Sequence, residues 1–129
     1  MKTKIKIHTD STGFVPAFID NSLNPSTAKE ILKALPITSS AQLWGDEIYF
    51  SIPVSMSEES ARVEVNVGDL AYWPPGNSFC IFFGRTPASQ SDKPAAASAV
   101  NVFGYVEGDS SLFRKVKNGE TITISLDDD

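Results

Sequence analysis

Alternation of apolar and polar residues dominates the sequence and predicts a mainly β protein. Three segments alternate most regularly, with isoleucine, valine or leucine at every second position: Lys4–His8, Arg62–Val67 and Thr121–Leu126. This period places successive side chains on opposite faces of a strand, with one face buried. Six further segments have strand character: Phe14–Ile19, Ser39–Trp44, Glu47–Ile52, Leu70–Trp73, Phe79–Gly84 and Val100–Val106. About nine short strands in one domain are typical of a closed barrel or a sandwich.

Glycine and proline residues mark the turns between these strands. Gly45-Asp46 stands between two predicted strands, and a glycine in the first position of a two-residue loop is typical of a type II′ hairpin. Pro74–Asn77 and Asn118-Gly119 are equally clear chain breaks. Ala88–Ala99 is rich in alanine and serine, and we expect it to form a mobile loop within the domain.

One segment has helical periodicity, and we expect a helix over about residues 25–35. Asn24 is a good N-cap, and Pro25 suits the first helical position because its missing N–H would have no partner there. Four residues form one apolar stripe: Ala28, Ile31, Leu32 and Leu35. Pro36 ends the helix, since a proline disfavours the α conformation of the residue before it. A short second helix is expected at Ser110–Lys115.

Length and composition indicate one domain with an ordinary hydrophobic core. The chain has 129 residues and a mass of 14.0 kDa, with 41% hydrophobic and 21% charged residues. These values are typical of a folded globular protein. We assign residues 1–126 to a single domain and Asp127–Asp129 to an acidic C-terminal tail.

The charge distribution argues against nucleic acid and membranes as partners. The formal charge is −5, and it becomes −2 without the three terminal aspartates, so the body of the chain is close to neutral. Nucleic acid and anionic lipid need a concentrated basic patch. The longest strongly apolar run, Phe79–Phe83, is far too short to cross a bilayer, and the N-terminus lacks the apolar block of a signal peptide. We therefore expect a cytoplasmic protein.

Residues suited to metal or covalent chemistry are scarce. The chain has one histidine, His8, and one cysteine, Cys80, whereas a metal site needs several converging ligands. Cys80 lies in an apolar run and is interpreted as a buried hydrophobic residue, and His8 as a solvated surface residue. No two glycines have the spacing of a dinucleotide or phosphate-binding loop. We predict no cofactor.

An aromatic cluster is the strongest candidate for a binding site. Ile48, Phe50 and Ile52 share one face of a strand and are predicted to lie in the core, while Glu47 and Tyr49 point to the opposite face. The predicted groove consists of five residues: Trp44, Glu47, Tyr49, Tyr72 and Phe82. We expect the aromatic surroundings to raise the pKa of the Glu47 carboxyl, because they disfavour its charged form. The alternative is that these side chains only pack beneath the helix or a loop.

Three segments together resemble a known family. They are Trp44-Gly45-Asp46-Glu47-Ile48-Tyr49-Phe50, the run Val67–Pro87, and Val102–Gly108. From Lys2 to about Leu126 the chain resembles the short prokaryotic cyclophilin-like domain family, whose members are mostly uncharacterised. It is more distantly similar to the cyclophilin peptidyl-prolyl isomerases. The resemblance implies a closed eight-stranded β-barrel capped by helices.

The resemblance to cyclophilins does not extend to their catalytic residues. Those enzymes use an arginine on the strand after the first helix to weaken the conjugation of the prolyl amide. The corresponding stretch, Ile37–Trp44, contains no arginine. The loop that supplies a tryptophan and a histidine in the enzymes corresponds to Ala88–Ala99, which has neither. Only the apolar floor has a counterpart, at Ile81 or Phe82.

Three functions stay open, in order of preference. The first is a non-catalytic module that binds a peptide or a small molecule in the aromatic groove. The second is a weak or divergent prolyl isomerase. The third is an unrelated enzyme in which Glu47 acts as acid or base while Arg85 or Arg62 holds an anion. The oligomeric state is also open, since an uncovered strand edge can pair with a second copy.

Overall fold

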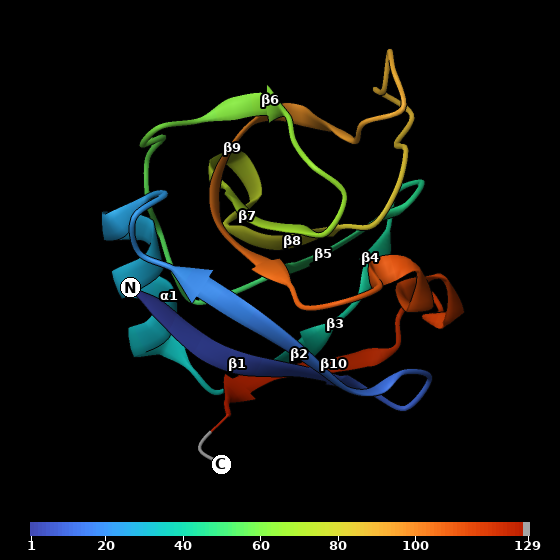
Figure 1. Cartoon of the computed structure of the whole chain (residues 1–129), viewed down its shortest axis with the longest axis horizontal. Coiled ribbons are helices and arrows are strands. Elements are labelled where there is room, and N and C mark those ends of the chain that lie inside the picture. The colour runs from blue at the N-terminus through green and yellow to red at the C-terminus, as the bar shows by residue number, and fades with distance from the viewer. Residues whose placement is uncertain (128–129) are drawn as a thin grey trace.

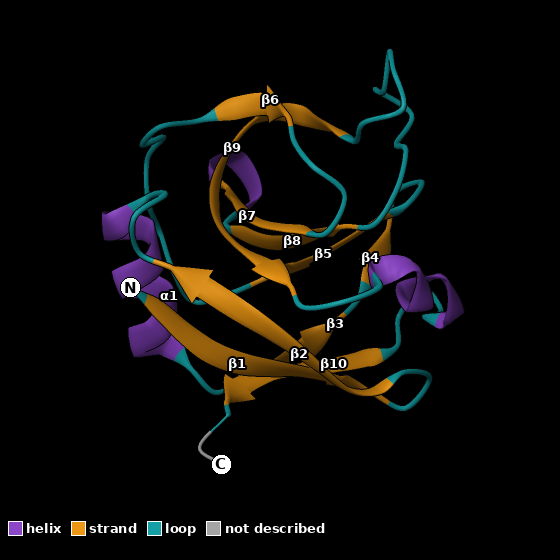
Figure 2. Cartoon of the chain, viewed as in Figure 1, coloured by secondary structure: helices purple, strands orange, loops and turns teal. Residues whose placement is uncertain are grey.

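The elements of the fold follow the order predicted along the chain. The computed structural model describes residues 1–127; Asp128 and Asp129, the end of the predicted acidic tail, lie outside the described residues. Within that range there are ten strands, one α-helix and two short 3-10 helices (Figures 1 and 2). The strands are β1 (Lys2–Thr9), β2 (Gly13–Asp20), β3 (Ile37–Ser40), β4 (Gln42–Leu43), β5 (Glu47–Ser51), β6 (Arg62–Glu64), β7 (Asp69–Trp73), β8 (Ser78–Phe82), β9 (Ala95–Val106) and β10 (Thr121–Leu126). The helices are α1 (Pro25–Ala34), η1 (Pro74–Gly76) and η2 (Ser110–Lys115).

The strands form one curled but open sheet, so the expected closed eight-stranded barrel is wrong. Their order is β3-β10-β1-β2-β9-β7-β8-β5-β4, and β6 pairs with β9 off this path. Every neighbouring pair is antiparallel. The mainly β class is confirmed, but the sheet has ten strands and its two ends, β3 and β4, do not pair with each other.

The strand predicted over Ser39–Trp44 is divided in two, and this division keeps the barrel open. β3 pairs with β10, whereas β4 pairs with β5 at the other end of the sheet. Between them Ala41 is fully buried, and its N–H donates to the Glu120 carbonyl at 2.8 Å. Near β5 the Ser39 hydroxyl donates to the Ser51 carbonyl at 3.1 Å. A single side-chain hydrogen bond thus links β3 to β5, whereas the two end strands, β3 and β4, share no ladder.

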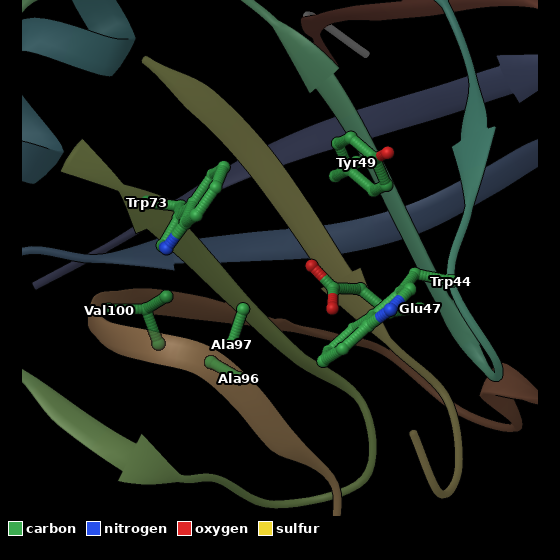
Figure 3. A pocket seen from close by; sticks show the side chains of 7 residues that line it. All are labelled: Trp44, Glu47, Tyr49, Trp73, Ala96, Ala97 and Val100. Atoms are coloured by element: carbon green, nitrogen blue, oxygen red, sulfur yellow. The ribbon is translucent and has the colours of Figure 1, made fainter. Parts of the chain in front are cut away.

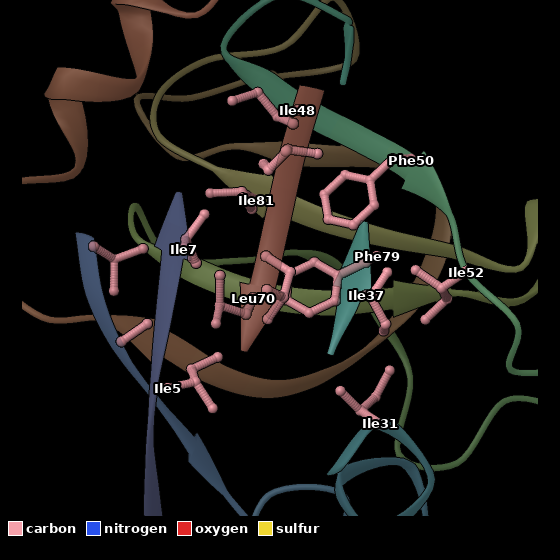
Figure 4. Close-up of a cluster of buried hydrophobic side chains, with 14 of the residues drawn as sticks. Ile5, Ile7, Ile31, Ile37, Ile48, Phe50, Ile52, Leu70, Phe79 and Ile81 are labelled. Carbon is pink, nitrogen blue, oxygen red and sulfur yellow. The ribbon is translucent and has the colours of Figure 1, made fainter. Parts of the chain in front are cut away.

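The concave side of the sheet holds the main hydrophobic core (Figure 4). Alternate residues of the strands contribute to it, as the period-two pattern predicts, and Ile48, Phe50 and Ile52 are buried there as expected. The Phe50 and Phe79 rings stack at a centroid distance of 5.1 Å. The predicted alternation fails in Arg62–Val67, where only Val65 is buried and Val63 and Val67 are about half exposed (47% and 56%).

Helix α1 covers one end of this core and begins at Pro25, as predicted. Asn24 occupies the N-cap position, but its side chain forms no capping bond. The cap is supplied by Glu59, whose carboxylate accepts the N–H groups of Ser26 and Thr27 at 3.2 and 3.1 Å. A carboxylate here also complements the partial positive charge of the helix N-terminus. None of the helices within residues 1–127 is long and apolar enough to cross a membrane.

Strand β9 positions the candidate site, and its first part corrects the prediction of a loop over Ala88–Ala99. Its 12 residues begin at Ala95. The second half pairs with β2 and β7, whereas the first half pairs with β6. The register against β7 shifts between Leu70 and Ala71, and such an irregularity bends a strand. In Figure 1, β9 curves out of the main sheet toward β6, so that both lie over β7 and β8.

Candidate functional site

The sheet face opposite the main core carries a second, smaller hydrophobic cluster. Its buried members come from β7, β8, β9 and the residue after β6: Val65, Ala71, Cys80, Phe82, Ala96, Val100 and Val102. Tyr49 and Trp73 pack against it as partly buried residues. The register of β5 against β8 pairs Glu47 with Phe82 and Tyr49 with Cys80. Because directly paired residues share a face, Glu47 and Tyr49 extend this cluster onto β5.

A pocket of about 200 Å³ opens over this second cluster (Figure 3). It is lined by seven residues: Trp44, Glu47, Tyr49, Trp73, Ala96, Ala97 and Val100. In Figure 3 the three aromatic side chains stand around the space, and β9 presents only small aliphatic side chains to it. The Glu47 carboxyl points into the space between Trp44 and Trp73. The pocket is therefore aromatic and apolar, with one acidic group.

The structure brings three of the five predicted groove residues together. Trp44, Glu47 and Tyr49 all line the pocket. Phe82 is not a lining residue; it is fully buried in the second cluster, where Glu47 pairs with it across β5 and β8. The division of β5 into a core face and an opposite face thus holds in the structure.

Tyr72 lies away from the pocket, in the main core. Its side chain is fully buried, and its hydroxyl donates to the Val54 carbonyl at 2.6 Å. The same hydroxyl accepts the Met56 N–H at 3.2 Å. These bonds fix the chain after β5, which gives the Tyr72 hydroxyl a structural role.

Sequence reasoning missed four lining residues, of which Trp73 is the largest. Leu70–Trp73 is apolar throughout after Asp69, so its pattern alone does not reveal which residues face the core. The pairing with β8 in the structure decides the faces, since Trp73 pairs with Ser78 and Tyr72 with the core residue Phe79. The remaining three come from the first half of β9, where alanine and serine gave no strand signal: Ala96, Ala97 and Val100.

Hydrogen bonds hold the two tryptophan walls in place. Trp44 and Glu47 close a two-residue hairpin through reciprocal backbone bonds of 2.9 and 3.2 Å. Gly45 in that turn has φ +60°, a conformation that glycine adopts without strain, and a Cβ there would lie 2.8 Å from the Pro87 ring. On the other side, the Trp73 indole N–H donates to the Ser98 hydroxyl at 2.7 Å, which ties β7 to the first half of β9.

Glu47 is the electrostatic centre of the pocket. Only 6% of its surface is exposed, and burial raises the pKa of its carboxyl from 4.5 to about 7. A hydrogen bond with the Cys80 thiol acts in the opposite direction and is the smaller effect. Within residues 1–127 no lysine or arginine forms an ion pair with Glu47. The expected raised pKa is thus present, and its cause is desolvation.

Cys80 is fully enclosed beneath the pocket. Burial, followed by the nearby Glu47 carboxyl, raises the pKa of its thiol well above the ordinary value. A thiol in this state is a poor nucleophile, because the thiolate is the reactive form. The interpretation of Cys80 as a buried hydrophobic residue agrees with this environment.

The other charged side chains that the structure describes lie outside this pocket. Arg62 faces Asp69 at 4.0 Å, and Arg85 lines a separate charged hollow in which Arg114 pairs with Asp46 at 3.1 Å. Neither Arg62 nor Arg85 belongs to the residues that line the pocket with Glu47. In the part of the chain that the structure describes, no three histidine, cysteine, aspartate or glutamate side chains come together as metal ligands.

Comparisons with known proteins agree with the fold. A hypothetical protein from Archaeoglobus fulgidus, known from its solution structure, is 38% identical to this chain with a TM-score of 0.81. The match covers 97% of this chain and 95% of that protein. No curated protein matches the chain. The family model described as Cyclophilin-like matches residues 3–125, and the chain therefore belongs to the cyclophilin-like family.

Proposed function

We propose that this protein binds a compact organic ligand in the pocket between Trp44, Trp73 and β9. The observation that supports the proposal is the Glu47 carboxyl, which is buried, has no ion-pair partner among the described residues and points into the pocket. Burying an ionised carboxyl without a compensating cation is costly. A carboxyl with a strongly perturbed pKa in a cavity is characteristic of a functional site.

The size of the pocket favours a small molecule over an extended peptide. Drug-sized ligands occupy pockets of roughly 300–1,000 Å³, whereas this one has about 200 Å³. Aromatic walls with a single polar group match the usual composition of small-ligand sites. The pocket therefore suits a compact molecule with an apolar body and one group that interacts with a carboxyl.

The two tryptophans allow a direct test, because both tryptophans of the chain line the pocket. We expect a library of small amines, alcohols and amides to contain ligands that shift both indole N–H resonances in the NMR spectrum. The same ligands should shift the backbone amides of Ala96 and Ala97. If library members shift only residues elsewhere on the surface, or if none produces a shift, the proposal is wrong.

A blocking variant separates specific binding from general surface effects. Ala97 is exposed at the rim of the pocket, so Ala97→Leu places a larger side chain over the opening without adding volume to the core. We expect it to abolish the ligand-induced indole shifts. Ala88→Leu makes the same change on the preceding loop, outside the lining residues, and should leave the shifts intact.

Prolyl isomerisation is the second candidate, and the family membership favours it. The seven residues that line the pocket include no arginine or histidine, so the pocket offers no matching donor to the prolyl nitrogen. For this reason we place it after ligand binding. A proline-containing tetrapeptide assay decides the matter: acceleration that Ala97→Leu removes would assign isomerase activity to this pocket.

A further inference from the structure

We infer that the ligand of this pocket is a small organic ammonium ion with a methylated head group, bound against the aromatic rings beside Glu47. This inference rests on the proposed function and names its ligand class. It follows from the combination of three aromatic walls with one buried carboxyl.

The aromatic walls come from three different places in the chain. Trp44 precedes the hairpin turn, Tyr49 lies on β5 and Trp73 ends β7, and Figure 3 shows their rings on different sides of the space. The face of an aromatic ring attracts a cation through its quadrupole, and tryptophan does so best. Cages of several aromatic side chains are the usual way in which proteins bind quaternary ammonium groups. Two tryptophans and one tyrosine provide such a cage here.

The charge of the pocket selects a cation over an anion or a neutral molecule. Among the described residues, Glu47 is the only acidic one that lines it, and none of the lining residues is a lysine, an arginine or a histidine. The side on β9 consists of Ala96, Ala97 and Val100, which offer no polar side chain. An anion would face the carboxylate without compensation, and a neutral ligand would leave its charge without a counter-ion. A cation supplies the opposite charge that no described residue places beside the carboxylate.

The groups that face Glu47 determine how binding depends on pH. Tyr49 on β5 and Cys80 on β8 are its titratable neighbours, while β7 and β9 present Trp73 and aliphatic residues to the pocket. The thiol of Cys80 stays protonated because burial raises its pKa. The Glu47 carboxyl, with a pKa of about 7, is mostly neutral at pH 5.5 and mostly ionised at pH 8. The affinity for the cation should therefore rise roughly ten-fold or more over this range.

A pair of isosteric ligands tests the inference. Choline and 3,3-dimethylbutan-1-ol have the same shape, but a carbon atom replaces the charged nitrogen in the alcohol. Titration of each into the protein at pH 8 and constant ionic strength is followed by fluorescence, since both tryptophans line the pocket. We expect choline to bind at least roughly ten-fold more tightly than the alcohol. Equal affinities, or tighter binding of the alcohol, would overturn the inference.

Variants identify the source of the preference. Glu47→Gln keeps the size of the side chain and removes its charge, so it should abolish the pH dependence of choline binding and reduce the preference for choline to the part that the aromatic rings supply. Trp73→Leu should weaken choline binding more than binding of the alcohol. Glu58→Gln makes the matched change at an exposed carboxyl outside the pocket and should change neither affinity. A choline preference that is undiminished in Glu47→Gln would contradict the assigned role of the carboxyl.

Failure of this inference is distinguishable from failure of the proposed function. If neither choline nor the alcohol binds while other library members shift the indole resonances, the pocket binds ligands and only the ammonium class is wrong. If no member of the library shifts the indole resonances either, both proposals are wrong.

Discussion

Glu47 lies on the strand face where solvent-exposed polar residues normally occur. Its alternation with Ile48 predicts that face correctly, but β9 folds over it and removes most of the solvent. The acid therefore keeps a position typical of a surface residue in an environment typical of a core. This change in environment raises the pKa of the carboxyl to about 7.

Replacement of this carboxyl should stabilise the protein at high pH. The pKa of the Glu47 carboxyl is about 7 in the folded chain against an ordinary value of 4.5, so the folded state holds the proton more tightly. The free energy of unfolding of the wild type therefore falls as the pH rises from about 4.5 through 7. The Glu47→Gln variant has no titrating group at this position, so its free energy of unfolding does not fall for this reason. We expect its stability relative to wild type to increase by roughly 2 kcal/mol between pH 5 and pH 8.

Urea unfolding of both proteins at the two pH values checks this prediction. Other titrating groups affect wild type and variant alike, so the difference between them isolates Glu47. Glu58→Gln, at an exposed carboxyl, should show no such pH-dependent difference. A Glu47→Gln stability difference that is the same at pH 5 and pH 8 would show that Glu47 titrates normally in the folded state.

At the scale of elements, the segment between β5 and β6 is fixed by buried asparagines on its neighbours. The Asn101 side chain on β9 is fully buried, accepts the Glu59 N–H at 2.8 Å and donates to the Ser57 carbonyl at 3.1 Å. Asn24 acts in parallel, since it accepts the Ser60 N–H and donates to the Val102 carbonyl, both at 2.7 Å. Together they join the start of α1, β9 and this segment.

Loss of the Asn101 side chain should therefore destabilise the fold. Asn101→Ala leaves the Glu59 N–H and the Ser57 carbonyl without that partner, and an unsatisfied buried polar group costs about 1–3 kcal/mol. We expect a loss of roughly 2 kcal/mol or more in the free energy of unfolding. The matched change Asn66→Ala, at an exposed side chain, should cost much less. Equal, small effects of the two substitutions in urea unfolding would refute the proposed anchoring.

Strand β9 shows where prediction of elements from the sequence reaches its limit. Val100–Val106 has a clear strand signal and forms part of β9. Ala95–Ala99 has weak strand propensity and becomes a strand because tertiary pairing with β6 supplies the hydrogen bonds. The same limit applies to Val63 and Val67, whose alternation suggests burial although no layer covers them. Local pattern predicts which residues can form strands, and long-range pairing decides which faces are covered.

For the molecule as a whole, the mainly β class, the position of α1 and the family were all predictable from the sequence. The open sheet was not, because the break at Ala41 changes the strand that the chain pairs with and has no local signature. The candidate site was predictable in part: Trp44, Glu47 and Tyr49 follow from one hairpin and one strand. The opposite wall of the pocket comes from β7 and β9, which are distant from β5 in the sequence. Which of their residues face the pocket is decided only when the sheet is assembled.

The most direct test of the central claim is an NMR titration of the Glu47 carboxyl carbon in the free protein, with saturating choline and with saturating 3,3-dimethylbutan-1-ol. A midpoint near 7 is expected in the free protein, because the pKa of the buried carboxyl is about 7. Choline should lower this midpoint, since a bound cation favours the ionised acid, whereas the neutral alcohol should not. A titration midpoint of the Glu47 carboxyl near 4.5 under all three conditions would contradict the claim that this buried acid binds a cationic ligand.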